Sequence, residues 1–149
     1  MKRLALILSI GIPMVFADCS KDDSEPVKLG SKEFSLHSVD KPEVQGKVTF
    51  YEKKDGSTDV VLQLNGSSTD IHPGFIYNGK ESSGGSVAIT LNPIECDCQS
   101  STTTITKLDN GTAITYDALK AFNGHVKIHQ SADELQTVIA KGNIGINVQ

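Results

Sequence analysis

Residues 48–64, VTFYEKKDGSTDVVLQL, decide the fold of this chain. Two largely apolar runs flank the dipeptide Asp55-Gly56, and Asp-Gly between such runs is a strong signal for a β-hairpin. In the second run Val60, Leu62 and Leu64 recur at every other position, and alternate residues of a strand lie on one face of a sheet. We therefore expect a hairpin here, with these three side chains in the core.

The same pattern continues along the chain, where short runs of alternating apolar residues are separated by glycine-containing turns. Val87, Ile89 and Leu91 form another such run, which we expect to face the core. About seven to nine strands in roughly a hundred residues is the size of a two-sheet sandwich. Four Asn-Gly dipeptides mark turns, at residues 65–66, 78–79, 110–111 and 123–124.

Two short segments near the C-terminus predict helical turns within this β-rich pattern. Residues 116–122, YDALKAF, read as one turn of helix, and residues 131–134, SADE, fit a capping box for a second. Strands are expected at residues 125–129, 137–140 and 144–148. The predicted fold class is therefore all-β, a two-sheet β-sandwich with one or two short helical turns near the C-terminus.

The N-terminus combines Lys2 and Arg3 with an apolar run that ends just before Cys19. This pattern is typical of a secretory signal, and it resembles a bacterial lipoprotein signal, in which the cysteine after the cleavage site is lipidated. The sequence predicts a lipoprotein signal peptide at residues 1–18, a lipidated Cys19 with a flexible acidic tether at 19–31, and one domain at 32–149. An alternative is an ordinary secreted protein in which Cys19 is a free thiol.

Residues 21–23, KDD, resemble the signal that exports some lipoproteins to the outer face of a Gram-negative cell. We therefore expect an outer-membrane-anchored lipoprotein of the cell envelope that faces the exterior. The 149 residues less the 18 of the leader leave 131, with 12 basic against 17 acidic side chains and a net charge of −5. Such a balance argues against binding a phosphate backbone, so no nucleic-acid partner is expected.

One resemblance to a known family rests on several separated blocks of the domain, namely residues 46–50, 71–77, 85–93, 114–117, 121–129 and 140–145. These blocks resemble the CHRD (chordin) domain of bacterial secreted proteins and lipoproteins. The resemblance implies a β-sandwich similar in architecture to copper/zinc superoxide dismutase. Its animal namesake is an extracellular binding protein.

The resemblance also raises the question of a copper or zinc site. Many bacterial members read His-Pro-Ala-His-Ile-His where residues 72–77 of this chain read HPGFIY, so His72 with His129 would be a remnant metal-binding pair. By alternation, His125 and His129 share one face of their strand, while Val126 and Ile128 face the core. We expect outward-facing, solvated histidines, with metal binding as the alternative.

Cys96 and Cys98 are separated by a single residue in a predicted loop. In an oxidising envelope two such cysteines are usually bonded, and a turn brings residues two apart within the reach of a disulfide. The alternatives are free thiols, or capture of a soft metal such as copper(I) with His72 or His129 completing the site.

No spacing in the sequence identifies a catalytic set, so the chain is not expected to be an enzyme. The favoured interpretation is a lipid-anchored, surface-exposed module that binds a protein, glycan or small ligand through its loops, since loops on a rigid sandwich suit recognition. The alternative is a copper- or zinc-binding protein with a degraded superoxide-dismutase-like site.

Overall fold

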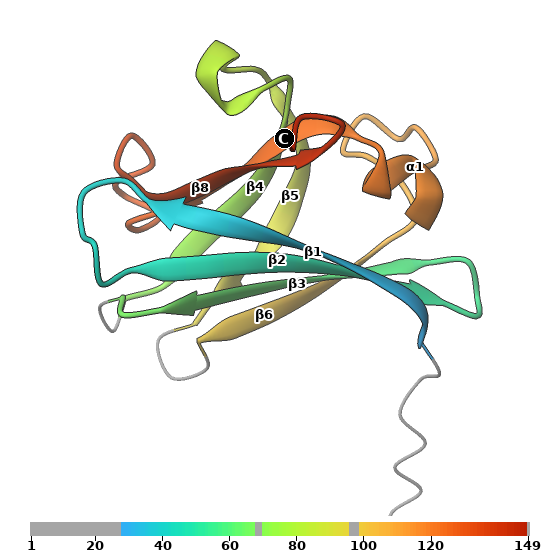
Figure 1. The fold of residues 1–149 in the computed structure, drawn as a ribbon, viewed down its shortest axis with the longest axis horizontal. Helices are drawn as coiled ribbons and strands as arrows, with labels where there is room; N and C mark the ends of the chain where they lie inside the picture. The colour runs from blue at the N-terminus through green and yellow to red at the C-terminus, as the bar shows by residue number, and fades with distance from the viewer. Residues whose placement is uncertain (1–27, 68–69, 96–98, 149) are drawn as a thin grey trace, which may run out of the picture.

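The computed structural model describes residues 28–67, 70–95 and 99–148. Within them the chain is almost entirely β-structure, as predicted, and one helical turn lies near the C-terminus (Figure 1). The elements are β1 Lys28–Ser38, β2 Gln45–Lys53, β3 Thr58–Asn65, β4 His72–Asn78, η1 Glu81–Ser83, β5 Val87–Ile94, β6 Ser100–Ile105, α1 Tyr116–Lys120, β7 Asn123–His129 and β8 Val138–Gly145.

The eight strands form one antiparallel ladder in the order β5-β4-β7-β8-β1-β2-β3-β6. Strand β1 divides it into two layers, because its length up to Leu36 pairs with β2 whereas only His37 and Ser38 pair with β8. In Figure 1, β4 and β5 cross steeply behind β2 and β3. The predicted all-β class is therefore confirmed, and the two expected sheets are the two layers of a single eight-stranded sheet that is continuous through β1.

The β2–β3 hairpin forms where the Asp-Gly signal predicted it. The amide of Gly56 donates to the carbonyl of Lys53 over 3.1 Å, and Gly56 adopts a φ of 82°. A carboxylate oxygen of Asp55 accepts hydrogen bonds from the amide and the hydroxyl of Ser57, at 2.9 and 2.6 Å. These bonds lower the pKa of Asp55 and fix the turn, which sets the register of both strands.

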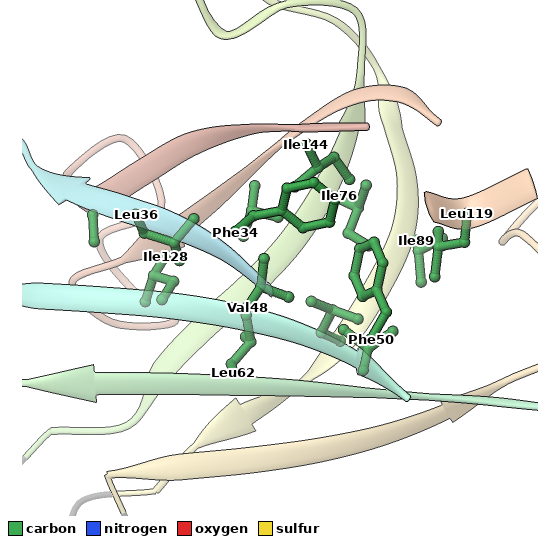
Figure 2. Packing of buried hydrophobic residues seen from close by; sticks show 14 of the residues in the cluster. Phe34, Leu36, Val48, Phe50, Leu62, Ile76, Ile89, Leu119, Ile128 and Ile144 are labelled. Atoms are coloured by element: carbon green, nitrogen blue, oxygen red, sulfur yellow. The ribbon is translucent and has the colours of Figure 1, made fainter. Parts of the chain in front are cut away.

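The core fills the space between the two sheets (Figure 2). Val60, Leu62 and Leu64 are buried, as their alternation predicted. The rings of Phe34 and Phe50 meet edge to face, with centroids 5.3 Å apart. Gly74 admits close packing of the layers, because a Cβ atom there would lie 2.4 Å from Cδ1 of Leu62.

The alternation predicted for β5 fails at one position. Ile89 and Leu91 are buried, but Val87 is 41% exposed and Ala88 takes its place in the core. The register with β4 shifts between Ile76 and Tyr77, and such a bulge moves the next side chain to the other face. The prediction of a buried Val87 is therefore wrong.

The C-terminal elements match the prediction in part. The predicted helical turn exists as α1, capped by a hydrogen bond from the amide of Ala118 to Oγ1 of Thr115. At residues 131–134 the second helical turn is absent, and the amide of Glu134 closes a simple turn on the carbonyl of Ser131. The reason is the hairpin between β7 and β8, which the hydrogen bond from Gln130 to Thr137 closes over this loop.

Two predicted boundaries also change. The strands expected at residues 137–140 and 144–148 are largely one strand, β8. At the other end β1 begins at Lys28, so residues 28–31, which were assigned to the flexible tether, belong to the sheet. The rest of the tether, Cys19 and the signal peptide lie outside the described residues. No helix within the described residues is long and apolar enough to cross a membrane.

The two edge strands, β5 and β6, are sealed against each other by side chains. The amide of Thr90 donates to the carboxylate of Asp109, at 3.0 and 3.1 Å to its two oxygens, and the Thr90 hydroxyl donates to it as well, over 2.8 Å. The amide of Asn92 donates to Oγ1 of Thr103, and Oγ of Ser101 donates to the carbonyl of Asn92, both over 2.8 Å. Unpaired edge groups invite association with other chains, so these bonds close the sandwich almost into a barrel.

We predict that Asp109→Ala lowers the free energy of unfolding by about 1–2 kcal/mol, because it leaves the Thr90 amide without its carboxylate acceptor. Urea unfolding followed by circular dichroism measures the change. Asp117→Ala is the matched control, since that exposed carboxylate contacts Lys120 within α1. An equal loss in the two variants would contradict the sealing role of Asp109.

Candidate binding groove

The candidate site lies on the surface of β4, β7 and β8 that is turned away from the core, here called the outer face. Cross-strand neighbours share a face, and the register pairs Tyr77 with His125 and Phe75 with Lys127. It also pairs Lys127 with Lys141 and His125 with Asn143. The same ladder turns Val126 and Ile128 into the core, as the alternation of residues 125–129 predicted.

Aromatic and imidazole rings form the base of the outer face. The rings of Tyr77 and His125 stack, with centroids 5.2 Å apart and planes 14° from parallel. The hydroxyl of Tyr77 lies 3.1 Å from Nε2 of His129, and the Phe75 ring meets the His129 ring edge to face at 5.5 Å. The ammonium of Lys127 lies 4.8 Å from the centre of the Tyr77 ring, where a cation–π interaction is favourable.

The segment after β4, residues 79–85, folds over this base. Nδ1 of His125 donates to the carbonyl of Gly79 over 2.8 Å. The amide of Glu81 donates to Oδ1 of Asn143 over 2.9 Å. One carboxylate oxygen of Glu81 then lies 3.2 Å from both Nε2 of His37 and Nζ of Lys141. We call this three-residue contact the Glu81 clamp, and it ties η1 to β1 and β8.

Two hollows flank the Glu81 clamp, and together we call them the groove. The larger, of about 560 Å³, lies where β1 and β8 separate, and its lining includes Lys32, Ser35, Lys80 and Asn143. The smaller, of about 410 Å³, lies over Lys127 and Lys141 and reaches Thr137. Glu81 lines both hollows. The groove is therefore polar at its centre, where side chains from β1, β8 and η1 meet.

The prediction of solvated histidines at His125 and His129 is wrong, although their predicted strand face is right. His125 is 0% exposed and His129 is 4% exposed, because residues 79–85 and the β7–β8 loop lie over them. Burial lowers the pKa of both rings below the ordinary 6.5, and the positive charge of Lys127 adds to this. The carbonyl of Gly79 works in the opposite direction on His125. Burial also raises the pKa of Tyr77.

The structure places His72, one of the predicted metal pair, beside the backbone of His129, with Nδ1 of His72 3.3 Å from the His129 carbonyl oxygen, but it turns the two rings to opposite faces of the sheet. His72 alternates with Gly74 and Ile76 on the core face of β4 and is 1% exposed, whereas the His129 ring contacts Phe75 and Tyr77 on the outer face. Nδ1 of His72 instead donates to the backbone carbonyl of Gln130 over 2.8 Å. No cluster of three or more His, Cys, Asp or Glu side chains suited to a metal occurs within the described residues.

Cys96 and Cys98, the predicted disulfide or soft-metal pair, lie outside the described residues. Their neighbour Ile94 pairs with His72, so His72 lies at the strand end that leads toward the two cysteines. The His129 ring lies on the other face of the sheet, so among the described residues His72 is the predicted ligand paired with the end of β5.

The Glu81 clamp could not be predicted from the sequence. Glu81 follows an Asn-Gly turn and is 44 residues from His37 and 60 from Lys141. The alternation of residues 125–129 was the only available signal. It correctly predicted that His125, Lys127 and His129 share one face of their strand, but it could not predict that another segment of the chain covers that face.

The sequence matches no protein-family model, and no curated protein matches it either. The resemblance to the CHRD domain rests on the sequence blocks given above and stays an interpretation.

We predict that the fold loses stability as the pH falls from 7.5 to 5.5. The unfolded chain takes up protons on these two rings near pH 6.5, whereas the folded chain keeps His125 and His129 neutral to lower pH. In that window the unfolded state binds more protons, so acidification favours it, by at most about 1.4 kcal/mol per pH unit for each ring. Urea unfolding at a series of pH values measures the slope.

The double variant His125→Gln/His129→Gln should reduce this slope, whatever its effect on stability at pH 7.5. His37→Gln is the control, because the His37 side chain is 60% exposed. An unchanged slope in the double variant would show that other groups cause the acid sensitivity.

Proposed function

We propose that this chain is a lipid-anchored protein of the cell envelope whose β-sandwich is a non-enzymatic binding module. The signal-like N-terminus and Cys19 support the anchor, and the groove supports binding. The observation that carries the binding proposal is the Glu81 clamp, which joins η1 to β1 and β8 at the centre of a polar groove through contacts within the chain itself. Preorganisation of this kind reduces the entropy lost on binding.

The chemistry of the groove favours recognition over catalysis. Glu81, the carboxylate at its centre, is held between His37 and Lys141, so it is engaged as a structural anion. The rings of His125 and His129 lie buried beneath the covering segments. Among the described residues, neither Ser35 nor Ser82 in the lining hydrogen-bonds a histidine, as an activated serine nucleophile would.

The anchor is tested by expressing the full chain in a Gram-negative host fed an alkyne-tagged fatty acid. We expect acylation and membrane association of the unsubstituted chain, and loss of both in Cys19→Ser, because the thiol is the predicted site of lipidation. Gel fluorescence and cell fractionation measure the two properties. Cys96→Ser is the matched control and should stay acylated. Acylation of Cys19→Ser would refute the anchor.

The binding module is tested by presenting the lipidated chain, in mild detergent, to arrays of glycans and peptides. We expect at least one ligand whose binding weakens in Glu81→Ala, because that change releases η1 from β1 and β8. Asp117→Ala again serves as the control for a lost carboxylate. A chain that binds nothing, or binds equally well without the clamp, would contradict the proposal.

We propose metal capture as the second candidate function, at His72 with Cys96 and Cys98. One observation favours it. The hydrogen bond from Nδ1 of His72 to Gln130 fixes the tautomer in which Nε2 carries the lone pair, and metal-binding histidines commonly donate their other ring N–H to such a carbonyl. Two thiolates and an imidazole suit copper(I) or zinc.

Metal capture is tested by loading the purified chain with copper(I) or zinc, desalting it and measuring bound metal. We expect near-stoichiometric metal, lost in the variant Cys96→Ser/Cys98→Ser and retained in His129→Gln. Circular dichroism checks that each variant is folded. Metal retained without the two cysteines would refute this site.

A further inference from the structure

The groove carries more positive charge than the rest of the chain, which has a formal net charge of −4. Lys32 and Lys80 line the larger hollow, and Lys127 and Lys141 line the smaller. Among the described residues Lys32, Lys80 and Lys127 form no ion pair, whereas the acidic side chain of Glu33 is paired with Lys47 at 2.9 Å. Asp40 and Glu81 are the other acidic groups of the lining, and Glu81 is shared between His37 and Lys141.

The directly opposed pair Lys127 and Lys141 is unfavourable for the fold itself. Like charges opposite each other destabilise a sheet, and the Cβ atoms of such a pair are about 4.5–5.5 Å apart. Glu81 compensates only Lys141, while Lys127 turns to the face of Tyr77. A sequence that keeps a local conflict of this kind commonly does so at a functional site. An anion between the two ammonium groups would relieve the repulsion.

The shape and lining of the groove define the rest of the ligand. The two hollows share Glu81 in their linings, so the lysines are divided between two neighbouring hollows and are not gathered in one pocket. Hydroxyl and amide groups of Ser35, Ser82, Asn143 and Gln136 lie among the lysines. These groups donate to and accept from hydroxyls, and lysine ammonium groups form charge-assisted hydrogen bonds with carboxylate and sulfate.

A peptide fits this site less well. Peptides that bind β-proteins in extended form add to an open sheet edge, and here the edges β5 and β6 are bonded to each other through side chains. We propose that the groove binds an acidic polysaccharide, with carboxylate or sulfate groups between Lys127 and Lys141 and beside Lys80. The inference rests on the proposed binding function and specifies its ligand class.

The test is binding of the lipidated chain, in mild detergent, to four polymers: polygalacturonate, dextran sulfate, neutral dextran and polyglutamate. We expect polygalacturonate or dextran sulfate to bind, and the affinity to fall with added salt because partly exposed charges are screened. Lys80→Gln/Lys127→Gln should weaken binding at least about tenfold, or about 1.4 kcal/mol. The matched control is Lys54→Gln/Lys107→Gln, which removes two exposed lysines outside the groove and should change binding less than about twofold.

Urea unfolding shows that each variant is folded before its affinity is compared. Equal weakening in the two double variants would overturn the proposal, because binding would then follow net charge and not this groove. Equal or tighter binding of polyglutamate would overturn the assignment to polysaccharides. If the arrays described above yield a neutral ligand that depends on Glu81 while neither acidic polysaccharide binds, the binding function stands and the acidic-polysaccharide inference fails.

Discussion

The passage of β1 from one sheet to the other is the constraint on which the rest of the structure depends. Up to Leu36 the strand pairs with β2, and at His37 and Ser38 it pairs with β8. The two strands approach so closely that a Cβ atom on Gly142 would lie 2.5 Å from the carbonyl oxygen of Ser35. Glycine at this position therefore permits the close approach of β1 and β8. The same approach brings His37 beside Lys141, so that the carboxylate of Glu81 contacts both side chains. The Glu81 clamp is a direct consequence of the strand order.

Local signals were sufficient for the elements and for most of the core. The turn at Gly56 and the alternation at Val60, Leu62 and Leu64 depend on neighbouring residues alone, and the structure confirms them. Val87 shows the limit, because a one-residue bulge reversed its face and nothing in an alternating run indicates a bulge. Residues 131–134 show a second limit of local signals. Their sequence fits a helix capping box, but closure of the hairpin between β7 and β8 outweighed this local preference.

The site was less accessible to sequence reasoning, for a physical reason. Alternation placed His125 and His129 on the correct face but could not show that segments before and after their strand cover it. Burial of these rings depends on contacts such as that between His125 and Gly79, which are 46 residues apart. The positions of Glu81 and Lys141 depend likewise on tertiary pairing, and a single acidic residue after a turn looks like ordinary surface.

The polar groups at the sheet edges and those on the outer face differ in how fully the fold compensates them. At the edges β5 and β6, backbone donors that would invite another strand are satisfied by Asp109 and Thr103. On the outer face, by contrast, Lys127 and Lys141 remain opposed and a carboxylate contacts only Lys141, although a neutral side chain at either position would remove the repulsion. The proposed acidic polysaccharide would account for this difference, because an anion placed between the two ammonium groups gains from the repulsion that the sheet sustains.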